Sequence, residues 1–299
     1  MNILELSHVS KHFGDKKVLQ DVTFSVPEKC IFGFIGRNGA GKTTTMKSIL
    51  GLIKIDSGDI TICGDKVAYG HNLTNRHIGY LPDVPEFYSY MTAREYLRLC
   101  GDVTGMKSSD IKTRSDELLE LVGLANEKHR IKGYSRGMKQ RLGIAQALIN
   151  RPKLLICDEP TSALDPVGRK EILDILSAAK EQTSVLFSTH ILSDVEKICN
   201  RIALLENGNI VISGTIDEIK HMRSEPDIEL SLQNADDTSK IIKEFPSAEM
   251  QEGKLIFKNA SDNQVEKILS FVAEQHIPII RFERHEPNLE DLFMEVIGK

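Results

Sequence analysis

The alternation of apolar and polar residues predicts an α/β protein over the first two thirds of the chain. Strand patterns, alternating or continuously apolar, occupy residues 3–9, 22–26, 30–35, 59–63, 78–82, 154–157, 185–188, 201–205 and 210–213. Between residues 91 and 149 the period changes to that of helices, and Thr92 with Glu95 forms a capping-box pattern. We therefore expect one domain, residues 1–224, with a helical subdomain at about residues 83–150 inserted between its strands.

The pattern starts again after Pro226. Strand and helix patterns there follow the order βαββαβ, over residues 228–232, 237–245, 249–251, 255–257, 263–275 and 277–282. This order is that of a small ferredoxin-like α+β domain, which we expect over residues 225–299. A last helix pattern places apolar residues on one face, namely Leu289, Leu292, Phe293, Val296 and Ile297. Such a stripe packs on its own domain more often than on a partner.

Composition and charge narrow the classes of function. The chain has 299 residues, 40% hydrophobic and 27% charged, which is ordinary for a globular protein. A net charge of −5 gives no electrostatic basis for nucleic-acid binding, so we expect no nucleic-acid partner. The five cysteines are scattered without a C-x-x-C pair, which favours free thiols over disulfides or a zinc site. Without a secretory leader or a membrane-spanning apolar stretch, we expect a cytoplasmic protein whose membrane role comes through a partner.

The segment GRNGAGKT, residues 36–43, has the P-loop spacing and lies between a predicted strand and a predicted helix. Its glycines let successive backbone N–H groups point inward and form an anion-binding nest. Lys42 would reach the β- and γ-phosphates, and the Thr43 hydroxyl would bind Mg²⁺. The predicted phosphate-binding residues are Gly36, Arg37, Asn38, Gly39, Ala40, Gly41, Lys42, Thr43 and Thr44. The alternative is a glycine-rich turn that binds nothing.

A second cluster follows two later strands. Asp158 and Glu159 end a buried strand, where an Asp can hold Mg²⁺ opposite Thr43 and a Glu can polarise the attacking water. His190 directly follows the strand at residues 185–188 and would reach the γ-phosphate. Each feature alone favours a plainer interpretation, a strand-end cap or a core histidine. Together with the P-loop, they indicate a nucleotide-hydrolysing site with Glu159 and His190 as catalytic residues.

Five motifs follow one another in a familiar order: GRNGAGKT as Walker A, YSRGMKQ as signature, LLICDE as Walker B, SALD as D-loop and the pair TH as switch histidine. With these motifs, the chain resembles the ATP-binding subunit of an ABC transporter from Met1 to about Gly214. The resemblance implies a P-loop NTPase fold, ATP and Mg²⁺ as cofactors, and a head-to-tail dimer with an identical or closely related subunit. Ser135 and Gly137 of one subunit would close over the ATP on the other.

The resemblance also implies an aromatic residue stacked on adenine, for which Phe13 is the match. A core phenylalanine is the alternative. Two departures from the family pattern stand out. Asp83 replaces the usual Gln, which makes it a metal-side or coupling residue, and Tyr134, Arg136 and Met138 replace the usual Leu, Gly and Gln of the signature.

These variant motifs resemble those of an exporter branch in which the ATPase and a polytopic permease are separate chains. EPNLEDLF, residues 286–293, resembles the end of that branch's accessory domain. We therefore expect an ATPase on the inner face of the cell membrane, contacting its permease through about residues 83–132. A translation or DNA-repair ATPase and a non-hydrolysing regulatory subunit remain alternatives. A GTPase lacks support because no N-K-x-D motif occurs.

Overall fold

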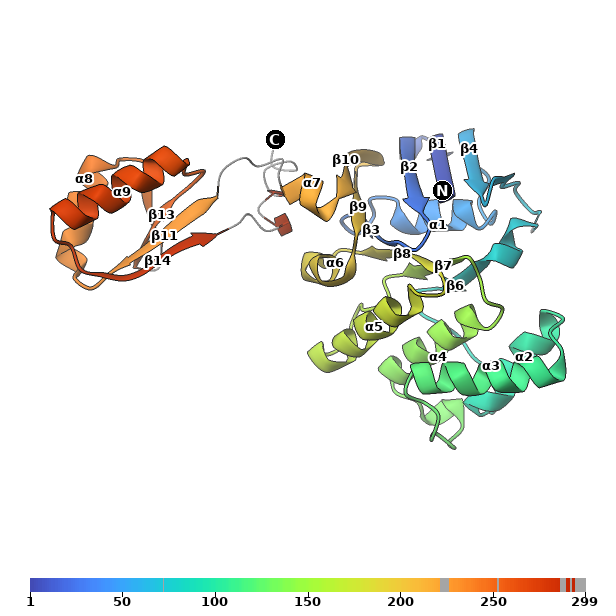
Figure 1. Ribbon diagram of the computed structural model, residues 1–299. Helices are drawn as coiled ribbons and strands as arrows, with labels where there is room; N and C mark the ends of the chain where they lie inside the picture. Colours follow the sequence, from blue (N-terminus) through green and yellow to red (C-terminus); the bar gives the residue numbers. More distant parts are fainter. Residues whose placement is uncertain (72, 221–225, 252, 286–288, 291, 294–299) are drawn as a thin grey trace. The chain divides into compact units, whose positions relative to one another are not determined.

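The computed structural model describes residues 1–71, 73–220, 226–251, 253–285, 289–290 and 292–293 (Figure 1). The chain divides into two compact units, Met1–Ile216 and Asp217–Lys299. The boundary expected between residues 224 and 225 lies outside the described residues, and the division by contacts comes earlier in the chain. Within the described part, none of the helices combines the length and apolar character that a membrane span requires.

An antiparallel sheet begins the first unit. Its strands have the order β2-β1-β4-β5, with β1 at Asn2–Phe13, β2 at Lys16–Pro27, β4 at Ser57–Ile62 and β5 at Asp65–Lys66. Leu4, Leu6 and Val22 of the β1–β2 hairpin are buried in the core, as the alternating pattern predicts. The hairpin is longer than the sequence pattern indicates, so Phe13 is the last residue of β1 rather than part of a loop between the strands.

A second, mostly parallel sheet carries the functional loops. Its order is β10-β9-β3-β8-β7-β6, with β3 at Ile31–Ile35, β6 at Ile78–Leu81, β7 at Leu154–Asp158, β8 at Ser184–Thr189, β9 at Arg201–Glu206 and β10 at Asn209–Thr215. Neighbours from β6 to β9 are parallel, and β10 is antiparallel to β9. Strands β3, β7 and β8 are buried along their whole length. The loops that follow β3, β6, β7 and β8 therefore meet at one edge.

The helices of the first unit are α1 at Lys42–Ile49, α2 at Ala93–Val103, α3 at Ser108–Leu121, α4 at Arg136–Leu148, α5 at Pro166–Ala179 and α6 at Leu192–Ile198, and α7 at Ile216–Lys220 begins at the boundary between the units. Short 3₁₀ turns lie at Thr74–His77 and Ile131–Gly133. The predicted capping box is present, because the Thr92 N–H donates to Glu95 Oε2 at 2.8 Å and the Glu95 N–H donates to the Thr92 hydroxyl at 3.3 Å. In Figure 1, α2, α3 and α4 gather on the side of this unit away from β1, β2 and β4.

The second unit has the predicted ferredoxin-like order. Its elements are β11 at Asp227–Leu232, the 3₁₀ turn Ala235–Asp237, α8 at Thr238–Glu244, β12 at Ala248–Gln251, β13 at Lys254–Phe257, α9 at Asp262–Glu274 and β14 at Ile279–His285. The sheet order is β12-β13-β11-β14 with antiparallel neighbours, and Ile228, Leu230 and Phe257 lie in its core.

Two details at the end of the chain differ from expectation or fall outside the described residues. The last strand begins at Ile279 rather than at residue 277, because the Ile277 N–H donates to Val272 O at 3.0 Å and closes helix α9. Of the predicted terminal stripe, Leu289, Leu292 and Phe293 are buried. Val296 and Ile297, like residues 286–288, lie outside the described residues.

Candidate functional site

A cleft of about 590 Å³ opens at the carboxyl edge of the parallel sheet. Its lining residues are Phe13, Lys16, Val18, Asn38, Gly39, Gly41, Lys42, Thr43, Thr44, Asp83, Asp158, Glu159, Ser162 and His190. The structure thus brings together most of the residues predicted to bind or hydrolyse a nucleotide. Lys16 and Val18 of β2 were not predicted, because they come close to the P-loop only in the folded protein.

The loop between β3 and α1 is shaped by its glycines. Gly41 has a φ of 116°, and a Cβ there would lie 2.9 Å from Val18 O. A Cβ on Gly36 would lie 2.6 Å from Leu205 O. Both positions therefore exclude any larger residue, the first also by backbone strain. Gly36, Arg37 and Ala40 belong to this loop without lining the cleft.

Lys42 begins helix α1 and is buried, with 6% of its surface exposed. Its Nζ donates to Gly36 O at 2.6 Å and to Arg37 O at 3.3 Å, and it lies 3.0 Å from Glu159 Oε1. The ammonium thus lies inside the curve of the loop, next to the carboxylate that ends the Walker B segment. This arrangement places a positive charge inside the loop that is predicted to bind phosphate.

Asp158 is held from two sides. Thr43 Oγ1 donates to Asp158 Oδ2 at 2.8 Å, and Ser188 Oγ donates to Asp158 Oδ1 at 2.7 Å. Ser188 also accepts the N–H of Glu159 at 2.9 Å. Sequence reasoning missed Ser188, although the parallel pairing of β7 with β8 places it directly beside Asp158. The feature of the sequence that could have indicated Ser188 is its place as a polar residue at the end of an apolar strand pattern.

Glu159 lies between two basic side chains. Its Oε1 pairs with Lys42, and its Oε2 lies 2.9 Å from His190 Nδ1. Glu159 also has a φ of 48°, a left-handed conformation that is uncommon for a residue with a side chain. Backbone strain of this kind persists where the surrounding structure fixes a side chain in one place. Here it aims the carboxylate into the cleft.

Asp83 follows β6 and lies at the same edge. Its Oδ1 is 3.5 Å from Arg136 Nη2, and its backbone oxygen accepts from Gln140 Nε2 at 2.7 Å. Burial raises the pKa of Asp83 above its ordinary value, Arg136 opposes this rise, and the charges of Asp158 and Glu159 add to it. Asp83 is therefore a third carboxylate that lines the cleft, and it is paired with Arg136.

Three other predicted residues lie in different surroundings. The Phe13 side chain is half exposed at the cleft and carries Lys11 Nζ 5.1 Å from its ring centre, so it is not a core residue. Ser135 is the N-cap of α4 and accepts the Met138 N–H at 3.2 Å. Neither Ser135 nor Gly137 belongs to the described lining of the cleft.

The cleft also fits a hard divalent cation. Thr43, Asp158 and Asp83 line it and offer hydroxyl and carboxylate oxygens, the donor type that Mg²⁺ prefers. The hydrogen bond between Thr43 and Asp158 shows that these two oxygens already converge. The donor set is therefore suitable for Mg²⁺.

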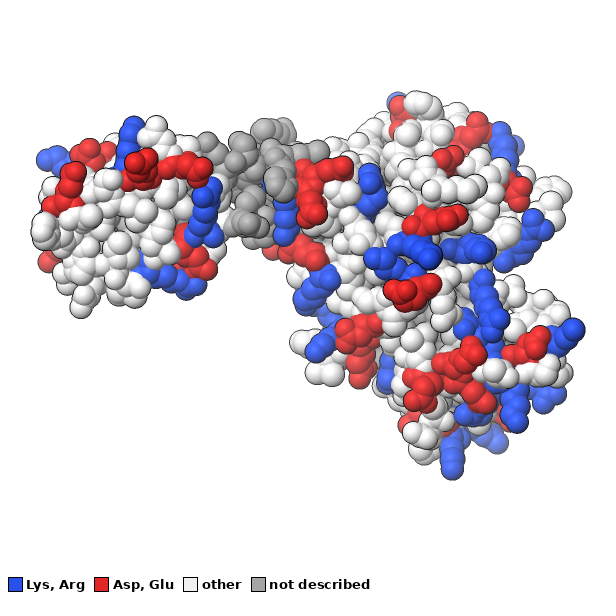
Figure 2. Space-filling model, viewed as in Figure 1, with Lys and Arg blue, Asp and Glu red and all other residues white. Residues whose placement is uncertain are grey.

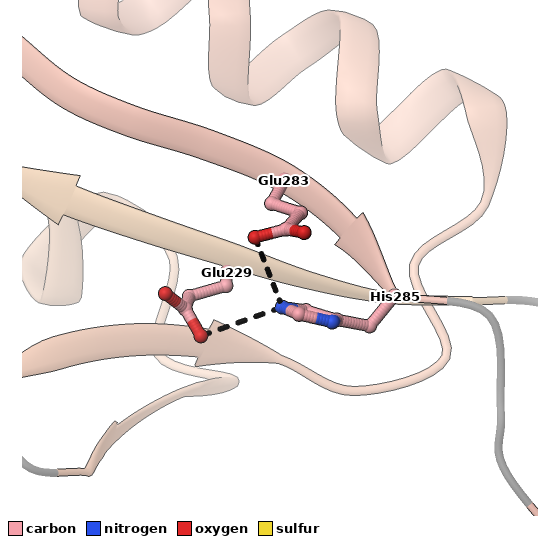
Figure 3. Close-up of side chains that lie close together, drawn as sticks. All are labelled: Glu229, Glu283 and His285. Carbon is pink, nitrogen blue, oxygen red and sulfur yellow. Dashed lines mark ion pairs between the residues drawn. The ribbon is translucent and has the colours of Figure 1, made fainter.

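A further group of metal-ligand type lies on the second unit (Figure 3). One oxygen each of Glu229 and Glu283 and a nitrogen of His285 lie within 4.8 Å of one another on β11 and β14. Glu229 is already paired with Lys254 at 2.8 Å, a hydrogen bond that lowers the pKa of Glu229, and Glu283 is paired with Arg281. With both carboxylates neutralised by basic residues, the group is an ion-pair network.

Comparison with known proteins decides the family. The family described as ABC transporter matches residues 19–162, and that described as ATP-binding protein DrrA1-3-like, C-terminal domain, matches residues 214–297. The "Uncharacterized ABC transporter ATP-binding protein YxlF" of Bacillus subtilis is 38% identical, over 99% of both chains. The chain is an ABC transporter ATP-binding protein. This confirms the resemblance drawn from the five motifs.

Two other relatives of this ABC transporter ATP-binding protein carry more specific names. The "Bacitracin transport ATP-binding protein BcrA" of Bacillus licheniformis is 35% identical over 99% of this chain and 97% of its own. The "Linearmycin resistance ATP-binding protein LnrL" of Bacillus subtilis is 31% identical over 99% of both. A solved ATP-binding subunit of an ABC transporter, 35% identical, covers 74% of this chain and 92% of its own with a TM-score of 0.66. The predicted P-loop NTPase fold is therefore confirmed.

Proposed function

We propose that this ABC transporter ATP-binding protein hydrolyses ATP as one half of a dimer and so drives export through a separate polytopic membrane subunit. The observation that carries the proposal is the position of Glu159, held between Lys42 and His190 and adjacent to Asp158. This is the arrangement needed to bind phosphate and to activate water at one point.

The phosphates of ATP enter the curve of the P-loop. There the backbone N–H groups donate to them, and Lys42 contributes a charge-assisted hydrogen bond. Lys42 then shares its charge between phosphate and Glu159, which loosens the pair seen at 3.0 Å. Thr43 and Asp158, with Asp83 beside them, would hold Mg²⁺, which when bound neutralises charge on the phosphate oxygens.

Glu159 acts as general base. It accepts a proton from the water that attacks the γ-phosphorus, while the bond to the β-phosphate oxygen breaks and leaves ADP and phosphate. His190 holds the second oxygen of Glu159 at 2.9 Å and so orients the carboxylate toward that water. Ser188 fixes the backbone of Glu159, because its hydroxyl oxygen accepts the Glu159 N–H.

In the proposed dimer, a second subunit completes the site. Ser135 and Gly137, at the start of α4, do not line the cleft of their own chain, which supports a second copy or close relative supplying them. The N-terminus of a 13-residue helix suits a γ-phosphate, since its N–H groups and dipole favour an anion. Phe13 would stack on the adenine of its own site.

Export and the membrane partner are supported by the names of relatives and by exposed apolar residues. Relatives named for bacitracin transport and linearmycin resistance favour export. Exposed Val84, Tyr88 and Tyr90, after Asp83, offer apolar surface to a membrane subunit within residues 83–132. Figure 2 shows Lys and Arg interspersed with Asp and Glu on the visible face, which gives no support to a nucleic-acid surface there. The protein would then lie on the inner face of the cell membrane.

Affinity purification of the full chain from its own cells tests the proposal. We expect it in the membrane fraction, bringing a polytopic protein with it, and ATP hydrolysis by the purified complex. Recovery with ribosomes or DNA, and hydrolysis without any membrane partner, would contradict the assignment to transport.

A further inference from the structure

A carboxylate at the edge of the cleft is paired with a basic side chain at the start of α4. The carboxylate belongs to Asp83 and the basic side chain to Arg136. Asp83 Oδ1 lies 3.5 Å from Arg136 Nη2. The two positions are far apart in the sequence, so the pairing of this negative charge with this positive charge is a property of the fold.

Helix α4 also holds Asp83 by its backbone. Gln140 is fully buried, and its Nε2 donates to Asp83 O at 2.7 Å. Arg136 and Gln140 are four residues apart and therefore lie on the same face of the helix. The helix thus binds the loop after β6 at two points, one at the side chain and one at the main chain.

Strand β6, which leads into Asp83, packs closely against α4. A Cβ on Gly79 would collide with the backbone oxygen of Ala147, so only glycine lets the helix come this near to the strand. Asp83 is connected to this strand by Pro82 alone, and Ser135 and Gly137 begin this helix. Asp83 and the start of α4 are therefore carried by two elements that pack directly against each other.

Before nucleotide and metal bind, Asp83 lies among other negative charges in the cleft. Asp158 and Glu159 face the same space, and the phosphates of ATP would add further negative charge. Lys42, the buried cation of the cleft, is already paired with Glu159. Arg136 is the basic side chain paired with Asp83 among the described residues.

We propose that Arg136 is a positioning residue that compensates the charge of Asp83 within its own subunit. It thereby connects the loop at one nucleotide site with the signature helix that completes the opposite site. The connection between the two sites rests on the proposed ATP-closed dimer, whereas charge compensation can be measured on a single subunit.

A double-mutant cycle on the full chain tests the pairing. All variants carry Glu159→Gln to prevent turnover, and the affinity for ATP with magnesium is measured by calorimetry. Arg136→Gln leaves Asp83 uncompensated and is expected to weaken ATP binding about fivefold to tenfold, an effect reduced by high salt. In an Asp83→Gln background, which has no carboxylate to compensate, Arg136→Gln is expected to change the affinity by less than about twofold. Arg136→Lys, which keeps the charge, should stay within about threefold of the parent.

Arg94→Gln is the matched control. Arg94 pairs with Asp116 away from the cleft, with side chains 52% and 47% exposed, against 47% for both Asp83 and Arg136. If the effects of Asp83→Gln and Arg136→Gln simply add, or if Arg94→Gln weakens binding as much as Arg136→Gln, the inference is wrong.

Sedimentation of the same proteins with ATP reports the second half of the proposal. We expect the parent to dimerise and Arg136→Gln to dimerise about tenfold more weakly at saturating ATP. In an Asp83→Gln background, Arg136→Gln should weaken dimerisation by less than about twofold. A parent that binds ATP but stays monomeric would contradict the proposed dimer and leave the binding cycle as a separate result. If Arg136→Gln dimerises as well as the parent does, the proposed connection between the two sites is wrong.

Discussion

The hydroxyl of Ser188 donates to Asp158 Oδ1 at 2.7 Å, across the parallel pairing of β8 with β7. The same oxygen accepts the N–H of the next residue, Glu159. One small side chain thus fixes both acidic residues of the Walker B segment, one through its carboxylate and the other through its backbone.

Ser188→Ala should therefore destabilise the protein by about 1–3 kcal/mol, because it leaves a buried carboxylate oxygen and a backbone N–H without a partner. Turnover should fall further than the affinity for ATP does, since Glu159 loses its fixed backbone. Urea unfolding and steady-state kinetics measure the two effects. Ser177→Ala, on the exposed side of α5, is the control. Unchanged stability and turnover would mean that Ser188 fixes neither residue.

Gly41→Ala should abolish ATP binding. The φ of 116° is unfavourable for alanine by about 1–3 kcal/mol, and the added methyl also meets Val18 O and Leu19. Gly64→Ala is the control for backbone strain outside the site, because Gly64 has a φ of 85°, no atom within 4 Å of an added Cβ, and no place in the cleft lining. Calorimetric titration with ATP should show loss only for Gly41→Ala, and ATP binding by Gly41→Ala equal to that of the parent would contradict the role of this glycine.

Phe13→Ala should weaken ATP binding by about 1–3 kcal/mol if the ring stacks on adenine. Phe13→Trp should keep most of the affinity, since it retains an aromatic face. Tyr69, an exposed aromatic outside the cleft, provides the control variant Tyr69→Ala. Equal affinities of Phe13→Ala and the parent would exclude the stacking role.

Asp56 provides a prediction for acid pH. Its carboxylate accepts from Lys11 Nζ at 2.9 Å and from the His12 N–H at 2.6 Å, and these bonds, that from Lys11 foremost, lower its pKa to about 2. A pKa lowered by folding contributes stability above the unfolded value of about 3.9 and loses it as the pH falls toward the folded value. The difference in free energy of unfolding between the parent and Asp56→Asn should be constant above about pH 5 and shrink below about pH 4. A difference that grows on acidification would contradict this assignment.

Much of the fold follows from local patterns. Continuous apolar runs indicated β3, β7 and β8, and the Thr92–Glu95 capping box marks the start of α2. The P-loop and the Asp158–Glu159 pair were found because their chemistry depends on residues adjacent in the chain. The order of the second unit was readable for the same reason, since each of its elements has a clear period.

Other features depend on contacts between distant segments. Ser188 beside Asp158, and Arg136 beside Asp83, follow from strand order and helix packing, which no local pattern specifies. The extension of β1 to Phe13 likewise depends on its pairing with Lys16 of β2. The start of β14 was misplaced because Ile277, apolar like a strand residue, instead closes the preceding helix.

The central claim is that Glu159 is the general base of a site completed by a second subunit. Its most direct test is Glu159→Gln, with hydrolysis and sedimentation measured on the same protein, and Glu181→Gln, an exposed glutamate outside the cleft, as control. Loss of a general base should lower turnover by about 10²–10⁴-fold, while ATP should hold the variant as a stable dimer. Turnover equal to that of the parent, or a monomer in saturating ATP, would contradict the account.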